Sequence, residues 1–496
     1  MATTRTTRKF KPAESFLHPT SDYHLLPFRF HPINETKEVL INEVGDFLVC
    51  PRGTATHIAN RTLETAGTLY EDLIAGHFIS PTPIPELIDI LATRYRTKKS
   101  FLNQFTALHI FVVTLRCNHS CHYCQVSRKT EKRGEFDIQR EDLDRSIDLM
   151  FQSPSPSVTM EFQGGEPLLA FDTVQYAVLR AKALNETHKK DITYVVCTNL
   201  TVLDDDMLAF FDEHDILLST SFDGPQFLHD KNRPKSGAAS YDMFVDNLAR
   251  ARQVVGKDSV SALMTTTRLS LEHPIDIIDS YLNHGFNSIF LRPISPYGFA
   301  LKNSKHNAYE TERFLEFYKT GLDHILELNR QGTFFREEYT CIILRKLLTP
   351  FSVGYVDLQS PAGLINSVVV YNYDGHVYAS DEARMLAENQ DFTFRLGHVQ
   401  KNTYQDLFYG QKAQEIAEHW ANESLPGCSE CGFQTICGAD PVHNHATQGD
   451  PVGYRPTNAF CQRNMEIIRY LIQLIDDPAH DARHIFQNWL KVETDE

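Results

Sequence analysis

The stretch that decides the fold is HIFVVTLRCNHSCHYCQ, residues 109–125. Its first seven residues, 109–115, are mostly apolar and β-branched or aromatic, which predicts a buried strand. The loop that follows carries Cys117, Cys121 and Cys124 in a Cys-x3-Cys-x2-Cys spacing. Parallel sheets place ligands at the carboxyl ends of their strands, so this loop is where chemistry is expected.

Five further short apolar segments alternate with amphipathic helical segments, a pattern typical of parallel βαβ units. The six predicted strands are residues 109–115, 158–162, 192–197, 216–221, 260–266 and 288–292. They span only about 185 residues, whereas an eight-strand barrel usually needs about 250. The pattern therefore predicts an α/β fold with a partial (β/α)6 TIM-like barrel.

Length and composition exclude several classes of protein. The chain has 496 residues, 42% hydrophobic and 23% charged, which is typical of a globular protein of two to four domains. The net charge of −16 repels phosphate backbones and anionic lipid, so neither nucleic acid nor membrane is an expected partner. No apolar run approaches the ~20 residues needed to span a bilayer, and none follows the basic start, so a cytoplasmic location is predicted.

Four domains are predicted, and the barrel is the second of them. The N-terminal one reads as a winged-helix-like α+β appendage, with a hairpin at Asn42-Glu43-Val44-Gly45. The predicted boundaries are 1–104 for this region, 105–305 for the barrel, 306–366 for a helical bridge, and 367–496 for a C-terminal domain ending in a helix.

The three-cysteine loop has the donors for an iron-sulfur cubane. Three thiolates can ligate three irons and leave the fourth without a protein ligand, free to chelate a small molecule. The alternatives are a zinc site completed by His119 or His122, or simply reduced thiols.

A second motif lies at the end of the next strand, where Gln163-Gly164-Gly165-Glu166-Pro167 follows Phe162. Paired glycines let the backbone approach a ligand closely, and a glutamate can accept a hydrogen bond from an ammonium group. A Gly-Gly turn alone is weak evidence, but after a strand and downstream of the cysteine loop it becomes strong evidence.

Four more cysteines cluster near the C-terminus: Cys428, Cys431, Cys437 and Cys461. Four thiolates would saturate a cluster, which suits electron relay or structural support. A zinc ribbon is the alternative, with His443 and His445 nearby. Ten cysteines in all are too few for a disulfide scaffold.

Together the cysteine loop and the Gly-Gly-Glu-Pro strand end resemble the radical S-adenosylmethionine (SAM) superfamily. The resemblance implies that Cys117, Cys121 and Cys124 hold a 4Fe-4S cluster whose open iron binds SAM. It further implies that the Tyr123 ring lies against the adenine of SAM. The turn that receives the methionine amine would be formed by Gln163, Gly164, Gly165 and Glu166.

Other strand ends resemble further SAM contacts of peptide-modifying members. Asn199 and Ser221 correspond to ribose and carboxylate contacts, and Arg292 to the segment flanking adenine; Arg233 is also expected to bind the cofactor. Each of these segments could instead be ordinary turn chemistry. Cys197, inside a predicted strand, is expected to be buried packing.

The C-terminal region resembles the auxiliary-cluster (SPASM or twitch) extension of peptide maturases, which usually holds two clusters. Here Ala379, Ser380 and Pro441 stand where relatives carry cysteines, so one auxiliary 4Fe-4S cluster, and two clusters in all, are predicted. Asp381 matches the aspartate that takes a substrate proton in sulfatase-maturating relatives. The alternative is a solvated acid, or one paired with Arg384.

Longer strings resemble one peptide-maturase family more closely, the B-component radical SAM maturase of the His-Xaa-Ser repeat peptide system. They include LLPFRF, SALMTTTR, FLRPISPYGFA, TPFSVGYVDLQSPAG, YNYDGHVYASDEARMLAE and ADPVHNHATQGDPVGYRPT. The resemblance implies as partners a ribosomal precursor peptide, a second radical SAM maturase and an electron donor such as flavodoxin or ferredoxin. The N-terminal region would pair with a leader strand, or simply cap the barrel.

The predicted function is thus a radical SAM maturase that abstracts hydrogen from a precursor peptide to install a crosslink, epimerisation or oxidation. The alternatives are a sulfatase-type protein maturase, or a non-catalytic iron-sulfur or zinc scaffold for a partner maturase.

Overall fold

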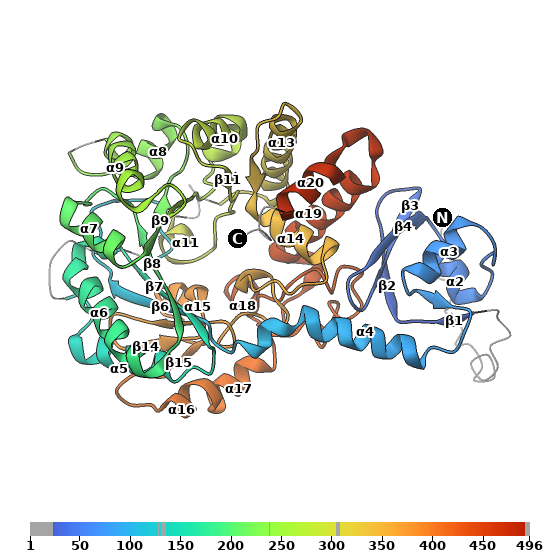
Figure 1. Ribbon diagram of the computed structural model, residues 1–496, viewed down its shortest axis with the longest axis horizontal. Coiled ribbons are helices and arrows are strands. Elements are labelled where there is room, and N and C mark those ends of the chain that lie inside the picture. Colours follow the sequence, from blue (N-terminus) through green and yellow to red (C-terminus); the bar gives the residue numbers. More distant parts are fainter. Residues whose placement is uncertain (1–22, 127, 130–134, 238, 304–307, 492–496) are drawn as a thin grey trace, which may run out of the picture. The chain divides into compact units, whose positions relative to one another are not determined.

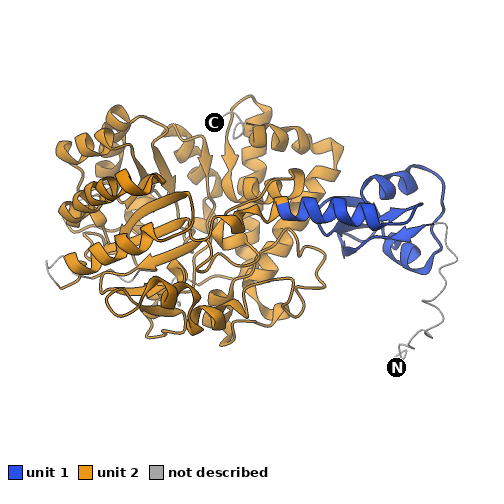
Figure 2. Cartoon of the chain, turned by 60° about the horizontal axis from the view of Figure 1, so that its bottom comes forward, with its two compact units in different colours: residues 1–96 blue, residues 97–496 orange. Residues whose placement is uncertain are grey.

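The structure is a computed structural model that describes residues 23–126, 128–129, 135–237, 239–303 and 308–491. The chain forms two compact units, residues 1–96 and 97–496 (Figure 2). The basic start of the sequence lies outside the described residues. No helix in the described ranges combines the length and the apolar character needed to cross a membrane.

Unit 1 is a small α+β body. Its antiparallel sheet has the order β2-β3-β4 and contains the predicted hairpin, which turns at Gly45 with φ 84°. Leu40, Ile58, Leu73 and Phe78 form the centre of its core. The elements are β1 (His24–Leu25), β2 (Phe28–Pro32), β3 (Lys37–Asn42), β4 (Phe47–Pro51), α2 (Thr54–Asn60), α3 (Thr68–Ala75), β5 (Ile79–Ser80) and α4 (Pro85–Lys98), which leads into unit 2.

Unit 2 is built on a mostly parallel sheet of eight strands, in the order β10-β9-β8-β7-β6-β13-β14-β15. The first five predicted strands are confirmed within a few residues, and they pair in parallel as consecutive neighbours: β6 (Leu108–Thr114), β7 (Ser157–Gly164), β8 (Asp191–Thr198), β9 (Ile216–Ser221) and β10 (Val260–Leu263). In two of the helical segments between these strands, the apolar residues that recur at helical spacing are buried, including Leu143 in the first and Phe244 in the second.

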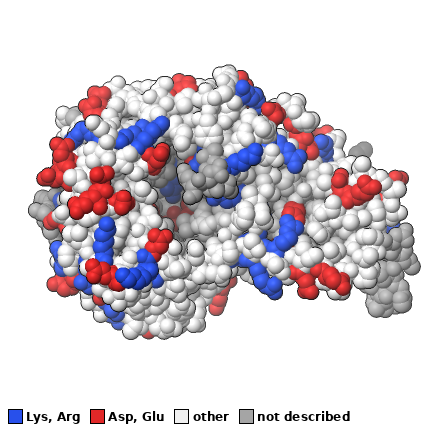
Figure 3. All heavy atoms as spheres, viewed as in Figure 1, with Lys and Arg blue, Asp and Glu red and all other residues white. Residues whose placement is uncertain are grey.

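Helices line one side of this sheet, where Figure 1 shows α5, α6, α7 and α9 in succession. The helices of this half are α5 (Arg140–Phe151), α6 (Phe171–His188), α7 (Asp205–Glu213), α8 (Gln226–Asn232), α9 (Ser240–Val255), α10 (Pro274–Asn283) and α11 (Gly298–Lys302). Acidic and basic side chains are interspersed over the face shown in Figure 3, as the mixed composition predicts.

The sixth predicted strand differs from expectation. Only Ser288–Ile289 (β11) is extended, and it pairs in parallel with β12 (Arg336–Glu337). Its link to the barrel is a single bridge between Thr266 and Pro293. The partner strand follows a 20-residue helix, so local periodicity could not reveal the pairing.

The C-terminal part continues the barrel sheet. Strand β13 (Val368–Tyr371) pairs in parallel with β6, and it forms the predicted hairpin with β14 (His376–Tyr378), which pairs with β15 (Arg395–His398). The remaining helices are α13 (Thr311–Arg330), α14 (Glu338–Leu348), α15 (Asp381–Ala387), α16 (Tyr404–Tyr409), α17 (Gln411–Ala417), α18 (Pro441–Gln448), α19 (Ala459–Asp476) and α20 (Ala482–Lys491).

Candidate active site

The three loop cysteines line one cavity of about 220 Å³ at the carboxyl ends of the barrel strands. We call it the cysteine cavity. Predicted residues that line it are Cys117, Cys121, Cys124, Tyr123, Gln163, Gly164, Gly165, Asn199, Ser221 and Arg233. The structure therefore brings ten predicted site residues, from five separate segments, to one place.

A buried charge pair anchors the cysteine loop. Arg233 donates from Nε and Nη2 to the two carboxylate oxygens of Asp223, at 3.0 and 3.1 Å. The Tyr123 hydroxyl donates to the same carboxylate at 2.6 Å, and the guanidinium lies 5.5 Å from the centre of the Tyr123 ring. Asp223 is fully buried, so this network fixes the loop to the segment after β9.

A second brace comes from the segment after β8. The Asn199 amide donates to Asn118 Oδ1 at 3.0 Å, and the Asn118 amide donates to Thr201 Oγ1 at 2.8 Å. Glu166 holds this segment in turn, because its carboxylate accepts from Thr198 Oγ1 at 2.8 Å and from the Asn199 backbone N–H at 2.7 Å. Burial raises the pKa of Glu166 to about 7, against these donors, which lower it.

Glu166 therefore lies behind the cavity, 1% exposed, with its carboxylate occupied by the chain's own donors. Its expected contact with an ammonium group stays a prediction.

The Gly-Gly turn has no room for side chains. A Cβ on Gly164 would stand 2.0 Å from the carbonyl oxygen of Thr114, and a Cβ on Gly165 would stand 2.2 Å from that of Arg116. The turn thus packs backbone against backbone at the start of the cysteine loop, with Gly165 N–H donating to Thr114 O at 2.8 Å. Glycine is required here because of this close approach.

The three thiols are close enough for their charges to interact. Burial, then Cys124 and Asp223, raise the pKa of Cys121 to about 12, while Arg233 lowers it. Burial, Cys121 and Cys124 likewise raise the pKa of Cys117, against the backbone N–H of His119. The thiols of Cys117 and Cys121 are therefore costly to ionise alone, and a bound metal would supply the compensating positive charge.

Residues outside the predicted set of cluster and cofactor ligands also line the cysteine cavity. Cys197 and Thr198 reach it from β8, Thr265 from the end of β10, and Met385 from α15. The strand-end rule could have found the first three, whereas nothing local connects Met385 with the barrel. Cys197, expected as packing, contributes a thiol to this cavity.

The C-terminal cysteines also come together. Burial, then Cys431, Cys461 and Cys428, raise the pKa of Cys437 to about 12, while the Lys346 ammonium lowers it. Burial, then Cys431 and Cys428, raise the pKa of Cys461 to about 11. These four thiols lie on the segment before α18 and at the start of α19.

The histidines considered for zinc have other surroundings. His445 bonds to Asp391 at 2.8 Å, and His443 lines a different cavity. His119 lines the cysteine cavity, whereas His122 lines another one. Within the described ranges no three His, Cys, Asp or Glu side chains converge on a single metal-ion position. A cubane needs no such convergence, because its thiolates bind separate irons.

Two of the positions where the resemblance implies cysteines in relatives lie at the start of a helix in this chain. Ser380 caps α15 by accepting from the Ala383 N–H at 3.2 Å. Pro441 is the first residue of α18, where a missing N–H is tolerated.

Asp381 is the first residue of α15. Its Oδ1 is buried and has no hydrogen-bond partner in the described structure. Burial raises the pKa of Asp381, against Arg384, Arg292 and a hydrogen bond with Gln163. Gln163 lines the cysteine cavity, whereas Arg292 lines a neighbouring cavity described below.

The alternative pairing of Asp381 with Arg384 is not formed as an ion pair. Arg384 is 1% exposed and donates to Val126 O at 3.3 Å and to Asn372 Oδ1 at 3.4 Å. The proposed role of Asp381 as a base stays a prediction.

Barrel, cysteine loop and Gly-Gly turn together define a radical SAM enzyme. Residues 111–281 match the model of the Radical SAM superfamily, so this part of the chain is a radical SAM domain. Members of that superfamily use SAM and a 4Fe-4S cluster. The residues of the cysteine cavity fit these groups, since three thiols converge there without saturating a cluster and the glycine turn leaves backbone exposed beside them.

Known proteins of similar sequence or structure include sulfatase-maturating enzymes and a protein solved with its precursor peptide. A cysteine-type anaerobic sulfatase-maturating enzyme of Clostridium novyi (strain NT) is 21% identical, over 73% of this chain and 94% of that protein. The structure of native anSMEcpe with bound AdoMet and Kp18Cys peptide superposes with a TM-score of 0.59 at 19% identity, covering 74% of this chain and 98% of that one. Streptococcus suis SuiB bound to precursor peptide SuiA gives a TM-score of 0.52 at 13% identity, covering 88% and 98%.

Proposed function

We propose that this radical SAM enzyme is a maturase that modifies a ribosomally synthesised precursor peptide. The observation that carries the proposal is the convergence of three thiols and the Gly-Gly turn on one cavity, with the buried, unpartnered carboxylate oxygen of Asp381 near Gln163 of that cavity. When bound at Cys117, Cys121 and Cys124, the cluster would deliver one electron to SAM, and the resulting 5′-deoxyadenosyl radical would remove a substrate hydrogen.

The chain's own residues have separate tasks in this proposal. Tyr123, Gly164, Gly165, Asn199, Ser221 and Arg233 would hold SAM in the cysteine cavity. Asp381 would accept a proton from the substrate when an oxidation requires its loss. Cys428, Cys431, Cys437 and Cys461 would hold one auxiliary 4Fe-4S cluster, as an electron relay.

A precursor peptide is favoured by the reach of the similarity to SuiB, which was solved with its precursor. Unit 2 contains 400 of the 496 residues, so a match over 88% of the chain extends into unit 1. We propose that unit 1 binds the leader of the peptide through an edge of its small sheet. A second maturase and a flavodoxin or ferredoxin remain proposed partners.

Anaerobic reconstitution with iron and sulfide, followed by reductant and SAM, tests the chemistry. We expect 5′-deoxyadenosine and methionine; their absence from a fully loaded protein would refute the proposal. Replacing all three loop cysteines with Ala should leave one cluster's worth of iron, and complete iron loss would contradict the second site. Cys50→Ala, in unit 1, is the matched control and should keep both clusters.

The second candidate is a sulfatase-type maturase, which the names of the Clostridium relatives favour. Mass spectrometry separates the two. A precursor peptide co-expressed with this protein should lose two hydrogens if it is crosslinked or oxidised. If it is epimerised, it should keep its mass in ordinary water and gain deuterium in deuterated solvent. Turnover of a sulfatase-derived peptide alone would favour the second candidate.

A further inference from the structure

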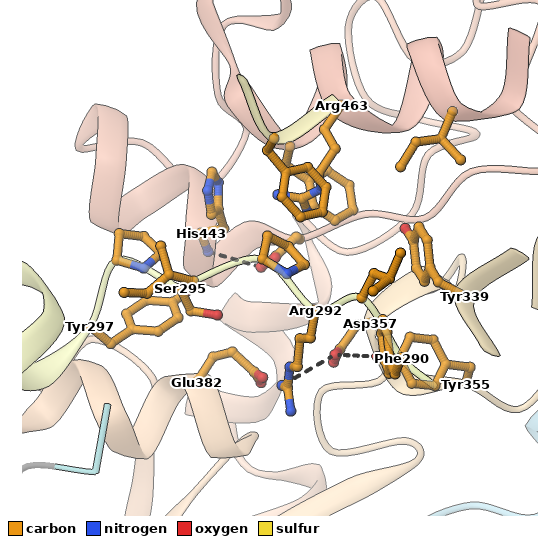
Figure 4. A pocket seen from close by; sticks show the side chains of 18 residues that line it. Phe290, Arg292, Ser295, Tyr297, Tyr339, Tyr355, Asp357, Glu382, His443 and Arg463 are labelled. Atoms are coloured by element: carbon orange, nitrogen blue, oxygen red, sulfur yellow. Dashed lines mark hydrogen bonds and ion pairs between the residues drawn. The ribbon is translucent and has the colours of Figure 1, made fainter. Parts of the chain in front are cut away.

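A second cavity is lined by Glu382, the residue that follows Asp381 in α15 (Figure 4). This acidic cavity has a volume of about 70 Å³, and its charged lining comes from Arg292, Asp357, Glu382, Asp440 and Arg463. It therefore holds three carboxyl groups against two guanidinium groups.

The acidic cavity opens toward an apolar one of about 230 Å³, with which it shares Pro293, Phe314 and Arg463. The apolar cavity is lined largely by Ile294, Leu301 and other apolar side chains. A site for a water needs roughly 10–15 Å³, so the acidic cavity has room for about five atoms of that size. This is the size of a charged side-chain head, with its aliphatic stem in the apolar cavity.

Two nearly buried polar groups in the acidic cavity have no partner in the described structure. The Tyr297 hydroxyl, on a residue 1% exposed, makes no hydrogen bond, and neither does Nδ1 of His443, on a residue 9% exposed. Both side chains line the cavity (Figure 4). Burying such groups unpaired is costly, so they indicate a missing ligand.

The carboxyl groups differ in how they are used by the chain itself. Asp440 caps α18 by accepting from the His443 N–H at 2.9 Å, and Asp357 accepts from the Tyr355 hydroxyl at 3.0 Å. Glu382 has no hydrogen bond or ion pair among the described residues, and Figure 4 shows it between Tyr297 and Arg292.

The cavity's own cations do not neutralise it. Arg292 lies 3.9 Å from Asp357, and Arg463 lies 5.5 Å from the centre of the Phe460 ring. Burial, then repulsion from Asp357, Asp381 and Asp440, raises the pKa of Glu382 well above its usual range, against Arg292. A further cation beside Glu382 would relieve this repulsion.

We propose that the acidic cavity binds a positively charged side chain of the peptide substrate, through Glu382, Tyr297 and His443. A guanidinium or ammonium group brings only donors, and all three residues offer an acceptor atom. The inference deepens the proposed function and rests on it for the identity of the substrate as a peptide. Because α15 carries both Glu382 and Met385, which line the two cavities, the anchored residue would lie next to the cysteine cavity.

Ligand-observed NMR with small probes tests the inference without cluster or SAM. The probes are n-butylguanidinium, its neutral isostere n-butylurea, and the anion pentanoate. Hydrogen bonds to charged groups contribute about 1.5–3 kcal/mol, so n-butylguanidinium should bind roughly tenfold more tightly than n-butylurea. Pentanoate should bind more weakly still.

Variants then locate the preference. Glu382→Gln should abolish the difference between n-butylguanidinium and n-butylurea, whereas Glu418→Gln, which removes an exposed carboxylate just after α17, should preserve it. Equal binding of the two probes to the unmodified protein would overturn the inference, as would a preference that survives Glu382→Gln. Neither result depends on 5′-deoxyadenosine formation, so failure of the proposed function would be seen separately.

Discussion

The charge pair beneath the cysteine loop gives the sharpest test of how the site is held. Asp223→Asn removes the charge that Arg233 and Tyr123 bond to and changes the shape very little. The amide can still accept from one of them, but the guanidinium loses its bidentate partner in a site where Arg233 is 9% exposed.

The size of the effect follows from burial. Removing one partner of a buried ion pair costs about 3–5 kcal/mol, because the other charge is left uncompensated. If this cost falls on opening of the loop, the open population should rise roughly 150- to 5000-fold, since 1.36 kcal/mol corresponds to a factor of ten. The double variant Asp223→Asn/Arg233→Met should recover much of the loss, because neither charge is then left alone.

Thiol alkylation of the metal-free protein measures this opening. Trypsin cleaves after Arg116 and Arg128, so the three loop cysteines leave in one peptide whose alkylation rate can be followed by mass spectrometry. Cys341, buried in α14, is an internal reference that should not change. An unchanged rate in Asp223→Asn, or additive effects in the double variant, would show that the pair does not hold the loop.

Three other substitutions test separate parts of the site and of unit 2. Gly165→Ala should weaken SAM binding and lower the free energy of unfolding by about 1–3 kcal/mol through overpacking against backbone, whereas Gly354→Ala, with no atom within 4 Å of its Cβ, should have little effect in calorimetry and denaturation. Burial raises the pKa of Glu423, but Lys99 and hydrogen bonds outweigh burial and lower this pKa to about 2. The ionised carboxylate therefore stabilises the fold, and the free energy of unfolding should fall as the pH drops from about 4.5 to 2 and the carboxylate is protonated. Solvent screening limits this loss to about 1 kcal/mol, and Glu423→Gln should lack it; an equal acid loss in that variant would exclude the pair as the cause. Asp381→Asn should lower peptide modification about 100-fold or more while 5′-deoxyadenosine still forms, and equal losses of both products would refute a role as base.

Local signals predicted the barrel strands and the position of the cysteine loop. Strands such as Ile216–Ser221 are short and apolar, and the loop cysteines follow a strand end, so a few neighbouring residues carry the information. Residues 404–417 show the limit of such local signals, because their helical pattern continues across Gly410 whereas the structure has two helices there, α16 and α17.

Long-range pairing could not be predicted in this way. Nothing near Ser288 indicates that its partner is Arg336, and nothing near Val368 indicates that it joins Leu108. The same holds in the site: Asp223 and Arg233 could each be assigned to a loop, but their bidentate bond depends on how α8 packs. Met385 reaches the cysteine cavity only because β13 and β14 place α15 there.

The pairing of β13 with β6 also bears on how this enzyme can be dissected. A fragment that ends after the sixth barrel segment would lack β13, so one edge of β6, the strand before the cysteine loop, would have no partner strand. An exposed apolar strand edge of this kind is a template for aggregation. The C-terminal segment with the four cysteines thus completes the barrel sheet through β13. A chimaera that replaces this segment from a point before residue 368 loses β13, so the incoming segment must supply a parallel strand of its own.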